Sequence, residues 1–377
     1  MKVYLDHAST TKTIEEAVDA MNKCFSDNYG NANSSHNFGR RAVSAVDEAR
    51  EKIARIIGAK PKEIFFTSGG TEADNWALKG LWLANLGKKN KLIVSAEEHS
   101  AIIETANTLK SLGVNVEFVY PSSDGIIEPK KIEDLIDDQT FLVSVMFVNN
   151  ETGVTNDIKE IASVCHKNGV LFHSDCVQAT CSKKLSVGDL GVDLMTVSAH
   201  KIGGPKGIGF LFVKEGVVIR PLVEGGSQES GLRGGTTNVP SVVGFAVAME
   251  KNDKDFEKRV NKLVALRDYF ERELAKTGLD IVVNGKNRIP SISNVTFRGV
   301  LATVLLTRLD MLGIAVSAGS ACTAGSIDAS HVLLSMGINE KDAKSSLRFS
   351  FGEENTFEEI DFVIKALKDI CVELTNK

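Results

Sequence analysis

Lys201 occupies a segment that could hold a reactive amine between two buried strands. An apolar stretch ends at Val197, Ser198 to Lys201 follow, and a glycine-rich turn leads to a second apolar stretch at 209–213. Burial would disfavour the ammonium form, lower the pKa and free the neutral amine for nucleophilic attack. A lone loop lysine is more often a solvated surface residue, but here Ser198 and His200 could bind a phosphate while the amine reaches an aldehyde. Pyridoxal phosphate carries both groups, so we expect Lys201 to form an imine with it.

A second candidate phosphate contact follows the apolar stretch at 63–67. Residues 68–71 read Ser-Gly-Gly-Thr and precede a helical pattern. A glycine turn at a helix N-terminus presents backbone N–H groups and the positive end of the helix dipole to an anion, and Thr71 adds a hydroxyl. The same residues could cap a helix without any ligand. Gly70 and Thr71 therefore support a phosphate site only in combination with the other candidate residues.

Polar residues also follow three further apolar stretches. His99, Asn150 and Asp175 each come at or shortly after the end of one stretch, and Gln178 follows Asp175. Helical patterns lie between the stretches, and this alternation predicts an α/β fold with a mainly parallel sheet. In such sheets ligands bind at the carboxyl ends of the strands, which is where these side chains would gather.

These side chains match the requirements of pyridoxal phosphate. Asp175 can keep the pyridine nitrogen protonated, so that the ring accepts electrons, while Gln178 can bond the ring hydroxyl. His99 can stack on the ring face. Taken singly, His99 could be a helix-entry residue, Asn150 a turn former and Asp175 an N-cap. Their joint occurrence favours a cofactor site.

Seven sequence motifs together resemble one known family, the cysteine desulfurases of the nitrogen-fixation and iron–sulfur-cluster type. These are pyridoxal phosphate enzymes of the class V aminotransferase, fold type I group, and the resemblance runs from Tyr4 to the last predicted helix. The motifs are FTSGGTEADN from Phe66, EEHSA from Glu97, NNETGV from Asn149, HSDCVQA from His173, SAHKIGGPKGIG from Ser198, GLRGGTTN from Gly231 and SAGSACTAGS from Ser317.

The resemblance implies a role for each candidate residue. Lys201, His99 and Cys322 would be catalytic, and Asn150 and Arg348 would bind the substrate carboxylate, a task for which the planar guanidinium is suited. In the plainer alternative, Arg348 is only a salt-bridge residue at a strand end. Thr236 would reach the phosphate of the partner subunit, which implies a homodimer. The remaining cofactor contacts would be Gly70, Thr71, His99, Asp175, Gln178, Ser198, His200 and Lys201.

Cys322 decides which reaction is expected. It lies in a ten-residue segment, 317–326, with no side chain larger than threonine or cysteine, so we expect a mobile segment. The resemblance implies that its thiolate takes the sulfur of L-cysteine as a persulfide, that L-alanine leaves, and that the persulfide passes to an acceptor protein. Free cysteines are usually inert core residues. That interpretation is adopted for the other cysteines, namely Cys24, Cys165, Cys176, Cys181 and Cys371.

The resemblance also implies two domains. Residues 15–250 would form a large pyridoxal-phosphate-binding domain around the mainly parallel sheet. Residues 1–14 and 251–377 would form a smaller α+β domain that carries the Cys322 segment. A long helical pattern from Val242 to Leu274 would link the two parts.

Composition excludes several classes of protein. The net charge is -5, which gives no general attraction to nucleic acid or to an anionic membrane. The N-terminus lacks the apolar core of a signal peptide, and no apolar run approaches the roughly 18 residues of a membrane span, so we expect a cytoplasmic protein. Six cysteines without a C-x-x-C pair indicate neither a disulfide framework nor a metal site.

The sequence departs from the family pattern at three places, and alternatives to the desulfurase function stay open. Cys176 stands where alanine is usual, Thr237 where glutamate is frequent, and residues 6–9 read Asp-His-Ala-Ser rather than Asp-Asn-Ala-Ala. A class V aminotransferase or selenocysteine lyase would use the same cofactor residues, and a non-catalytic dimeric scaffold would keep the fold alone. The acceptor could be an iron–sulfur scaffold protein, a tRNA-thiolating enzyme or a cofactor-biosynthesis carrier.

Overall fold

The structure is a computed structural model that describes residues 1–319 and 328–375. Its strands are β1 (Val3–Tyr4), β2 (Ile64–Thr67), β3 (Lys91–Ser95), β4 (Asn115–Val119), β5 (Thr140–Ser144), β6 (Leu171–Asp175), β7 (Leu194–Ser198), β8 (Gly209–Val213), β9 (Ile281–Val283), β10 (Ile292–Phe297), β11 (Ile314–Ala315) and β12 (Ser346–Ser350). Its α-helices are α1 (Glu15–Ser26), α2 (Asn37–Ile57), α3 (Gly70–Ala84), α4 (Ser100–Ser111), α5 (Pro129–Leu135), α6 (Ile158–Lys167), α7 (Val187–Leu190), α8 (Val239–Lys254), α9 (Phe256–Ala275), α10 (Ala302–Met311), α11 (His331–Ser335), α12 (Glu340–Ala343) and α13 (Phe357–Thr375).

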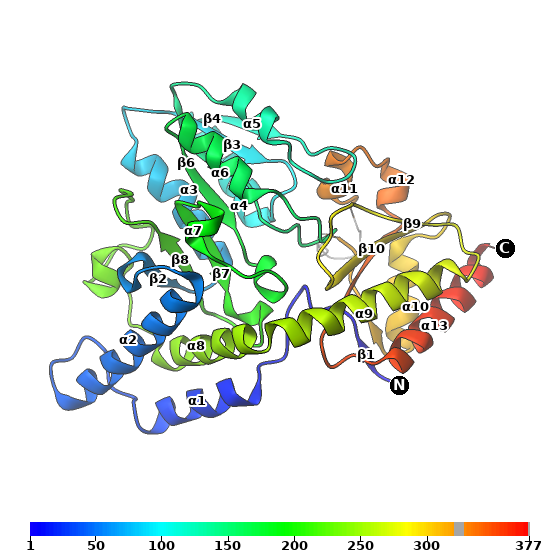
Figure 1. Cartoon of the computed structure of the whole chain (residues 1–377), viewed down its shortest axis with the longest axis horizontal. Helices are drawn as coiled ribbons and strands as arrows, with labels where there is room; N and C mark the ends of the chain where they lie inside the picture. Colours follow the sequence, from blue (N-terminus) through cyan, green and yellow to red (C-terminus); the bar gives the residue numbers. More distant parts are fainter. Residues whose placement is uncertain (320–327, 376–377) are drawn as a thin grey trace.

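A large sheet in the order β2-β8-β7-β6-β5-β3-β4 forms the centre of the molecule (Figure 1). All neighbouring pairs are parallel except those of β8, which runs antiparallel to β2 and to β7. The strands are apolar on both faces because helices cover both. In β8, for example, Phe210 and Phe212 belong to the core under α2, α6 and α8, whereas Leu211 and Val213 belong to the core under α3 and α4. The predicted α/β fold with a mainly parallel sheet is confirmed.

A small sheet in the order β12-β10-β9 is antiparallel and packs against α9, α10 and α13. Phe270, Phe297 and Phe349 form the centre of this second core. β1 pairs in parallel with β11 beside it, so the first residues of the chain return to its C-terminal part. Figure 1 shows both termini on this side of the molecule.

α8 and α9 connect the two cores (Figure 1). The sequence pattern predicts one long helix, but the structure contains two that meet at Asp255. α8 buries Val242 and Phe245 in the first core, and α9 buries Leu266 and Phe270 in the second. The division into residues 15–250 and residues 1–14 with 251–377 remains a proposal that this change of core supports.

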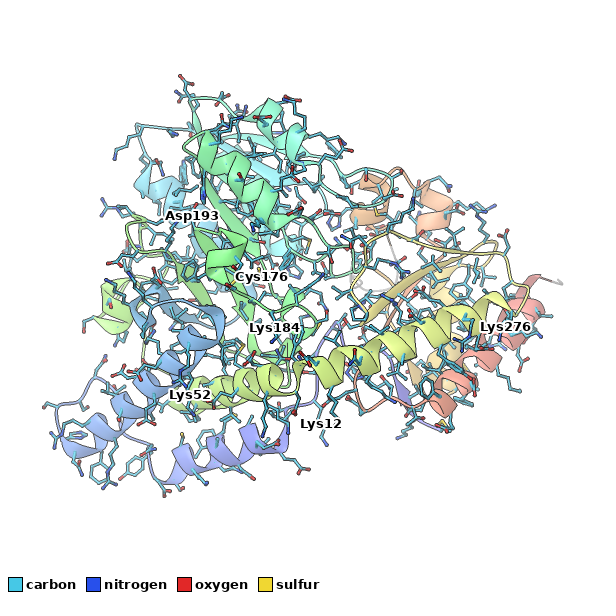
Figure 2. All side chains as sticks on the ribbon, in the orientation of Figure 1. Lys12, Lys52, Cys176, Lys184, Asp193 and Lys276 are labelled. Atoms are coloured by element: carbon cyan, nitrogen blue, oxygen red, sulfur yellow. The ribbon has the colours of Figure 1, made fainter. Side chains whose placement is uncertain are left out.

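The cysteines outside the Cys322 segment differ in exposure. Cys24, Cys165, Cys176 and Cys371 are buried, as expected for core residues, whereas Cys181 is half-buried. Cys176 lies inside the large-sheet part (Figure 2). None of the helices in the described part of the chain combines the length and the apolar character that a membrane crossing requires.

Candidate active site

A cavity of about 520 Å³ opens at the carboxyl edge of the large sheet. It collects side chains that follow β2, β3, β5, β6 and β7, together with residues from the N-terminal segment and from β12. Most of the predicted site residues line it: Gly70, Thr71, His99, Asn150, Asp175, Gln178, Ser198, His200, Lys201 and Arg348. Thr236 is exposed and does not line it, and Cys322 lies outside the described residues.

Close backbone packing places the N-terminus of α3 at one end of this cavity. Gly69 has a φ of +152°, a conformation that favours glycine. A Cβ atom on Gly209 would lie 2.6 Å from the carbonyl oxygen of Val197 and 2.9 Å from Cα of Gly69, so only glycine allows β8 to pass this closely. The Cβ atom of Ser198 lies 3.8 Å from where a Cβ on Gly70 would be. The first backbone N–H groups of α3 and the hydroxyl groups of Thr71 and Ser198 could together bind an anion.

Lys201 projects into the cavity and contacts the N-terminal segment. Its Nζ donates hydrogen bonds to the carbonyl oxygens of Ala8 and, over 3.0 Å, Ser9. Burial and, secondarily, the charge of Arg348 lower the pKa of Lys201 to about 8. A substantial fraction of neutral amine is therefore present near neutral pH, as nucleophilic or basic chemistry requires.

Asp175 and Gln178 lie on the wall that follows β6. The backbone N–H of Val177 donates to Asp175 Oδ1 over 2.8 Å. Burial raises the pKa of Asp175, and His99 and Lys201 oppose that rise. Gln178 Oε1 is buried and has no hydrogen-bond partner among the described residues, so it can accept from a donor on a ligand.

Buried ionisable groups lie behind this wall. Burial raises the pKa of Asp74 and of Glu98, and the negative charge of Asp175 adds to both shifts. Burial also lowers the pKa of His173 to about 3. Burial therefore disfavours the charged form of each of these three groups, whereas His99 and Lys201 favour the charged form of Asp175.

His99 has a defined tautomer. Its Nδ1 accepts a hydrogen bond from the backbone N–H of Ala101 over 3.1 Å, because the ring caps its own helix. A neutral His99 must therefore carry its proton on Nε2. Burial lowers the pKa of this imidazole and keeps it neutral. The ring then offers the cavity a hydrogen-bond donor.

Arg348 is 4% exposed and joins three segments of the chain. It donates from Nη1 to the carbonyl oxygen of Asn150 over 2.8 Å, and from Nη2 to Asp6 Oδ1 over 2.9 Å and to Ser9 Oγ over 2.7 Å. Its Nε is buried without a partner in the described residues. The backbone N–H of Arg348 also donates to the carbonyl oxygen of Ser317, so the start of the Cys322 segment is attached to this residue.

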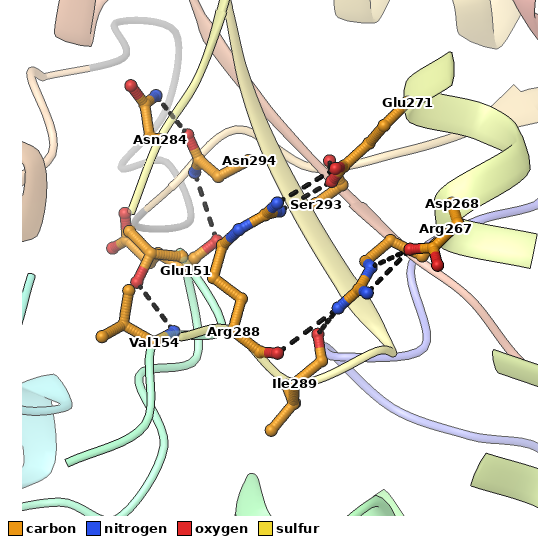
Figure 3. Close-up of polar contacts among 11 residues, drawn as sticks. Glu151, Val154, Arg267, Asp268, Glu271, Asn284, Arg288, Ile289, Ser293 and Asn294 are labelled. Atoms are coloured by element: carbon orange, nitrogen blue, oxygen red, sulfur yellow. Dashed lines mark hydrogen bonds and ion pairs between the residues drawn. The ribbon is translucent and has the colours of Figure 1, made fainter. Parts of the chain in front are cut away.

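The loop that contains Asn150 is attached to the small sheet (Figure 3). Asn294 Nδ2 donates to the carbonyl oxygen of Glu151 over 3.2 Å, and Asn284 Nδ2 donates to Asn294 Oδ1 over 2.7 Å. Arg288, whose backbone pairs with Val154, forms two hydrogen bonds of 2.7 and 3.0 Å with the Glu271 carboxylate on α9. These contacts position one wall of the cavity relative to β10 and α9.

Several lining residues were missed by the sequence analysis. Ser9, Asp74, Glu98, Met146, Glu151, Ser317, Gly319 and His331 also line the cavity. Glu98 follows the same strand as His99, so its place after an apolar stretch was a usable signal. Glu151 directly follows Asn150 after an apolar stretch and had the same signal. His331 gave no local signal, because only the approach of α11 to the sheet edge brings it to the cavity.

The residues present fit pyridoxal phosphate. An unpartnered buried acceptor at Gln178, a low-pKa amine at Lys201 and a glycine-lined helix N-terminus at Gly70 lie around one cavity of suitable size. Asp175 adds a carboxyl group on the same wall as Gln178. This donor set provides partners for an aldehyde, a phosphate, a ring hydroxyl and a ring nitrogen.

Comparisons with known proteins agree with this geometry. The family model described as aminotransferase class-V matches residues 3–363. The cysteine desulfurase IscS of Dictyoglomus turgidum is 39% identical over 375 residues, which cover 99% of this chain and 95% of that protein. A solved structure described as a NifS-like protein has a TM-score of 0.94 and 35% identity, covering 99% of this chain and 100% of that one. Another, described as SspA in complex with cysteine, has a TM-score of 0.83 and 34% identity, covering 94% and 100%. The chain therefore belongs to the class-V aminotransferase family of pyridoxal phosphate enzymes, among the IscS/NifS-type cysteine desulfurases.

Proposed function

We propose that this protein is a cysteine desulfurase, a sulfurtransferase that converts L-cysteine to L-alanine and leaves the sulfur on Cys322 as a persulfide. One observation carries the proposal: Lys201 and Arg348 line one cavity, and Gly319, which lies within the Cys322 segment, and His331, which follows that segment, line it too. An amine, a carboxylate-binding guanidinium and a thiol-bearing segment are the three groups that the reaction needs. The solved relative described as SspA in complex with cysteine supports the same substrate class.

The reaction balances without an external oxidant or reductant. The C–S bond of cysteine breaks and an S–S bond forms to Cys322, so the β-carbon is reduced while the enzyme thiol becomes a persulfide. Pyridoxal phosphate supplies the electron sink that makes removal of the α-proton possible. The balance of atoms is one cysteine and one thiol consumed for one alanine and one persulfide formed.

The chain's own residues bind the substrate and move its protons. Arg348 would bind the substrate carboxylate: its Nε has no partner in the described residues, while its Nη groups already donate to Asn150, Asp6 and Ser9, so a bidentate carboxylate would replace one of these contacts. Neutral Lys201 accepts the α-proton, since its pKa of about 8 is matched to neutral pH. His99 would hold the face of the cofactor ring and could offer its Nε2–H group to the sulfur of the substrate. Asp175 holds the ring nitrogen.

A homodimer is part of the proposal. Thr236 is exposed and lies outside the cavity of its own chain, which suits a contact with the phosphate in a partner subunit. Around the α1–α2 connection, Phe25, Tyr29 and Phe38 are exposed by 64%, 67% and 47%. Apolar side chains exposed together in this way are typical of an interface. Size-exclusion chromatography with light scattering should give twice the chain mass.

The sulfur acceptor and the location extend the proposal. We infer an acceptor protein of the iron–sulfur scaffold or tRNA-thiolating class, because a protein-bound persulfide needs a second thiol to receive it. A cytoplasmic location suits a catalytic thiol that must stay reduced. Co-purification followed by mass spectrometry would identify the acceptor.

The test is product formation by the purified protein with pyridoxal phosphate and L-cysteine. Alanine and a persulfide on Cys322 are expected in equal amounts in a single turnover. Cys322→Ala should keep the cofactor absorbance and abolish the persulfide, whereas an aminotransferase would be unaffected by this change. The unaltered protein should show the cofactor absorbance, and Lys201→Ala should lose it. A non-catalytic scaffold would show no such absorbance in either form. Absence of both products from the unaltered protein would refute the proposal.

A further inference from the structure

His331 is a second imidazole on the cavity wall, at the start of α11. Its Nε2 lies 2.9 Å from the carbonyl oxygen of Glu98. A carbonyl oxygen can only accept, so Nε2 must carry a proton, and the neutral ring has its lone pair on Nδ1. No hydrogen bond to Nδ1 is found within residues 1–319 and 328–375, and His331 is one of the residues that line the cavity.

His331 is held in place from two sides. Ser330 Oγ donates to Glu151 Oε2 and accepts from the backbone N–H of Leu333 over 3.2 Å, which fixes the first turn of α11. The Glu98 carbonyl fixes the ring itself. Ser330 and Glu151 are 4% and 2% exposed, so water does not compete for the hydrogen bond between them. A ring fixed at both its backbone and its Nε2 presents Nδ1 in one direction.

His99 and His331 face the same cavity with opposite hydrogen-bonding character. The described contact of His99 uses Nδ1 as an acceptor, which leaves Nε2–H as its free group. The described contact of His331 uses Nε2–H as a donor, which leaves the lone pair of Nδ1. One imidazole therefore offers a proton and the other accepts one.

The other candidate acceptors on the wall are already engaged or neutral. Burial raises the pKa of Asp74 and of Glu98, which disfavours the carboxylate form of both groups. Glu151 accepts from Ser330, and Asp175 accepts from Val177. His200 Nδ1 lies 3.1 Å from Thr10 Oγ1. Among the imidazoles of the described lining residues, His331 is the one whose contact with a carbonyl oxygen leaves a ring lone pair, on Nδ1, whereas the contact of His200 with a hydroxyl group does not fix its tautomer.

Resting on the proposed desulfurase function, we propose that His331 is a catalytic residue whose Nδ1 accepts the thiol proton of the bound cysteine as its sulfur is transferred. The S–H bond breaks and an N–H bond forms at Nδ1. The attacking thiolate supplies the electron pair of the S–S bond, and the pair of the C–S bond stays with the carbon fragment. The persulfide therefore forms as an anion, and the imidazolium returns its proton to solvent.

The first test measures the tautomer without any catalysis. In protein labelled with 15N-histidine and free of cofactor, the His331 signals, assigned by their loss in His331→Gln, should show a protonated Nε2 and an unprotonated Nδ1 above the titration of the ring. The opposite tautomer would overturn the proposal, whether or not the protein is a desulfurase. This result is independent of the proposed function.

The second test separates chemistry from binding. His331→Gln keeps an amide N–H for the Glu98 carbonyl but lacks a basic nitrogen, so kcat should fall about 100-fold while KM for cysteine and the cofactor absorbance stay near their original values. His166→Gln on α6, outside the cavity, is the matched control and should leave kcat unchanged. An active unaltered enzyme with an equally active His331→Gln variant would overturn the proposal, whereas an inactive unaltered enzyme would refute the desulfurase function itself.

Discussion

Arg348 Nη2 donates to Asp6 Oδ1 over 2.9 Å, across 342 positions of the sequence. The same N-terminal segment supplies the carbonyl oxygens of Ala8 and Ser9 to Lys201. The two cations proposed to bind and process the substrate are therefore positioned by one short stretch of chain. The positive charge of Arg348 lowers the pKa of Lys201, and the negative charge of Asp6 raises it.

Cofactor capture should depend on pH through Lys201. The amine is mostly charged below its pKa of about 8 and mostly neutral above it, so the rate at which cofactor-free protein gains the pyridoxal phosphate absorbance should rise as pH increases through about 8. Stopped-flow absorbance between pH 6 and 10 measures this. Lys206→Ala, which removes an exposed neighbouring lysine, is the control and should keep the midpoint. A midpoint near that of free lysine, about 10.4, would contradict the prediction.

Changes at Asp6 and Arg348 should move that midpoint in opposite directions. Asp6→Asn keeps a hydrogen-bond acceptor but removes a negative charge that favours the ammonium form, so the pKa of Lys201 should fall. Arg348→Gln removes a positive charge that disfavours the ammonium form, so the pKa should rise. The same stopped-flow titration checks both. Shifts of equal sign would mean that altered packing, not charge, controls the amine.

Glu97→Gln should change the pH dependence of stability. Glu97 is buried, and burial raises its pKa to about 8, so the folded state holds a proton that the unfolded state releases above about pH 4.5. The free energy of unfolding therefore falls as pH rises between these values, by at most about 1.4 kcal/mol per pH unit. The amide cannot titrate, so the variant should gain stability relative to the unaltered protein from pH 5 to 8. Urea unfolding at several pH values measures this, and a pH-independent difference would contradict it.

Gly209→Ala should damage the phosphate end of the cavity. The added Cβ meets the backbone of Val197 and Gly69, which cannot rotate away, so a loss of about 1–3 kcal/mol in unfolding free energy is expected. Displacement of the α3 N-terminus should weaken cofactor binding about tenfold or more. Gly188→Ala has open space around it and is the matched control for both measurements. Cofactor affinity equal to that of the control would show that the close contact of Gly209 with the backbone of Gly69 is not needed for cofactor binding.

Cys181 should react before the other described cysteines. It is half-buried and lies on a second cavity beside Lys201, whereas burial raises the pKa of Cys176 and raises that of Cys165 to about 12. Alkylation of the native Cys322→Ala protein, followed by peptide mass spectrometry, should label Cys181 first. Labelling of Cys176 at the same rate would show that the large-sheet core opens readily.

Local patterns were sufficient for the large sheet. Several strands are apolar stretches that end in or are followed by polar residues, so the order of the motifs along the chain was enough to predict that Asp175, Ser198 and His99 lie at one edge. Long helices were also predicted, but the break at Asp255 was not, because the apolar spacing continues through it while the core it faces changes.

Only the tertiary structure decided which distant residues meet. Asp6 and Ser9 reach Arg348 because β1 pairs with β11 and the N-terminal segment then crosses to the large sheet. His331 reaches Glu98 because α11 lies against that sheet edge. The amino-acid sequence by itself determined the residue types, their order and the family. The tautomer of His331, the pKa of Lys201 and the partners of Arg348 arise from burial and from contacts between segments far apart in the sequence, which local periodicity does not encode.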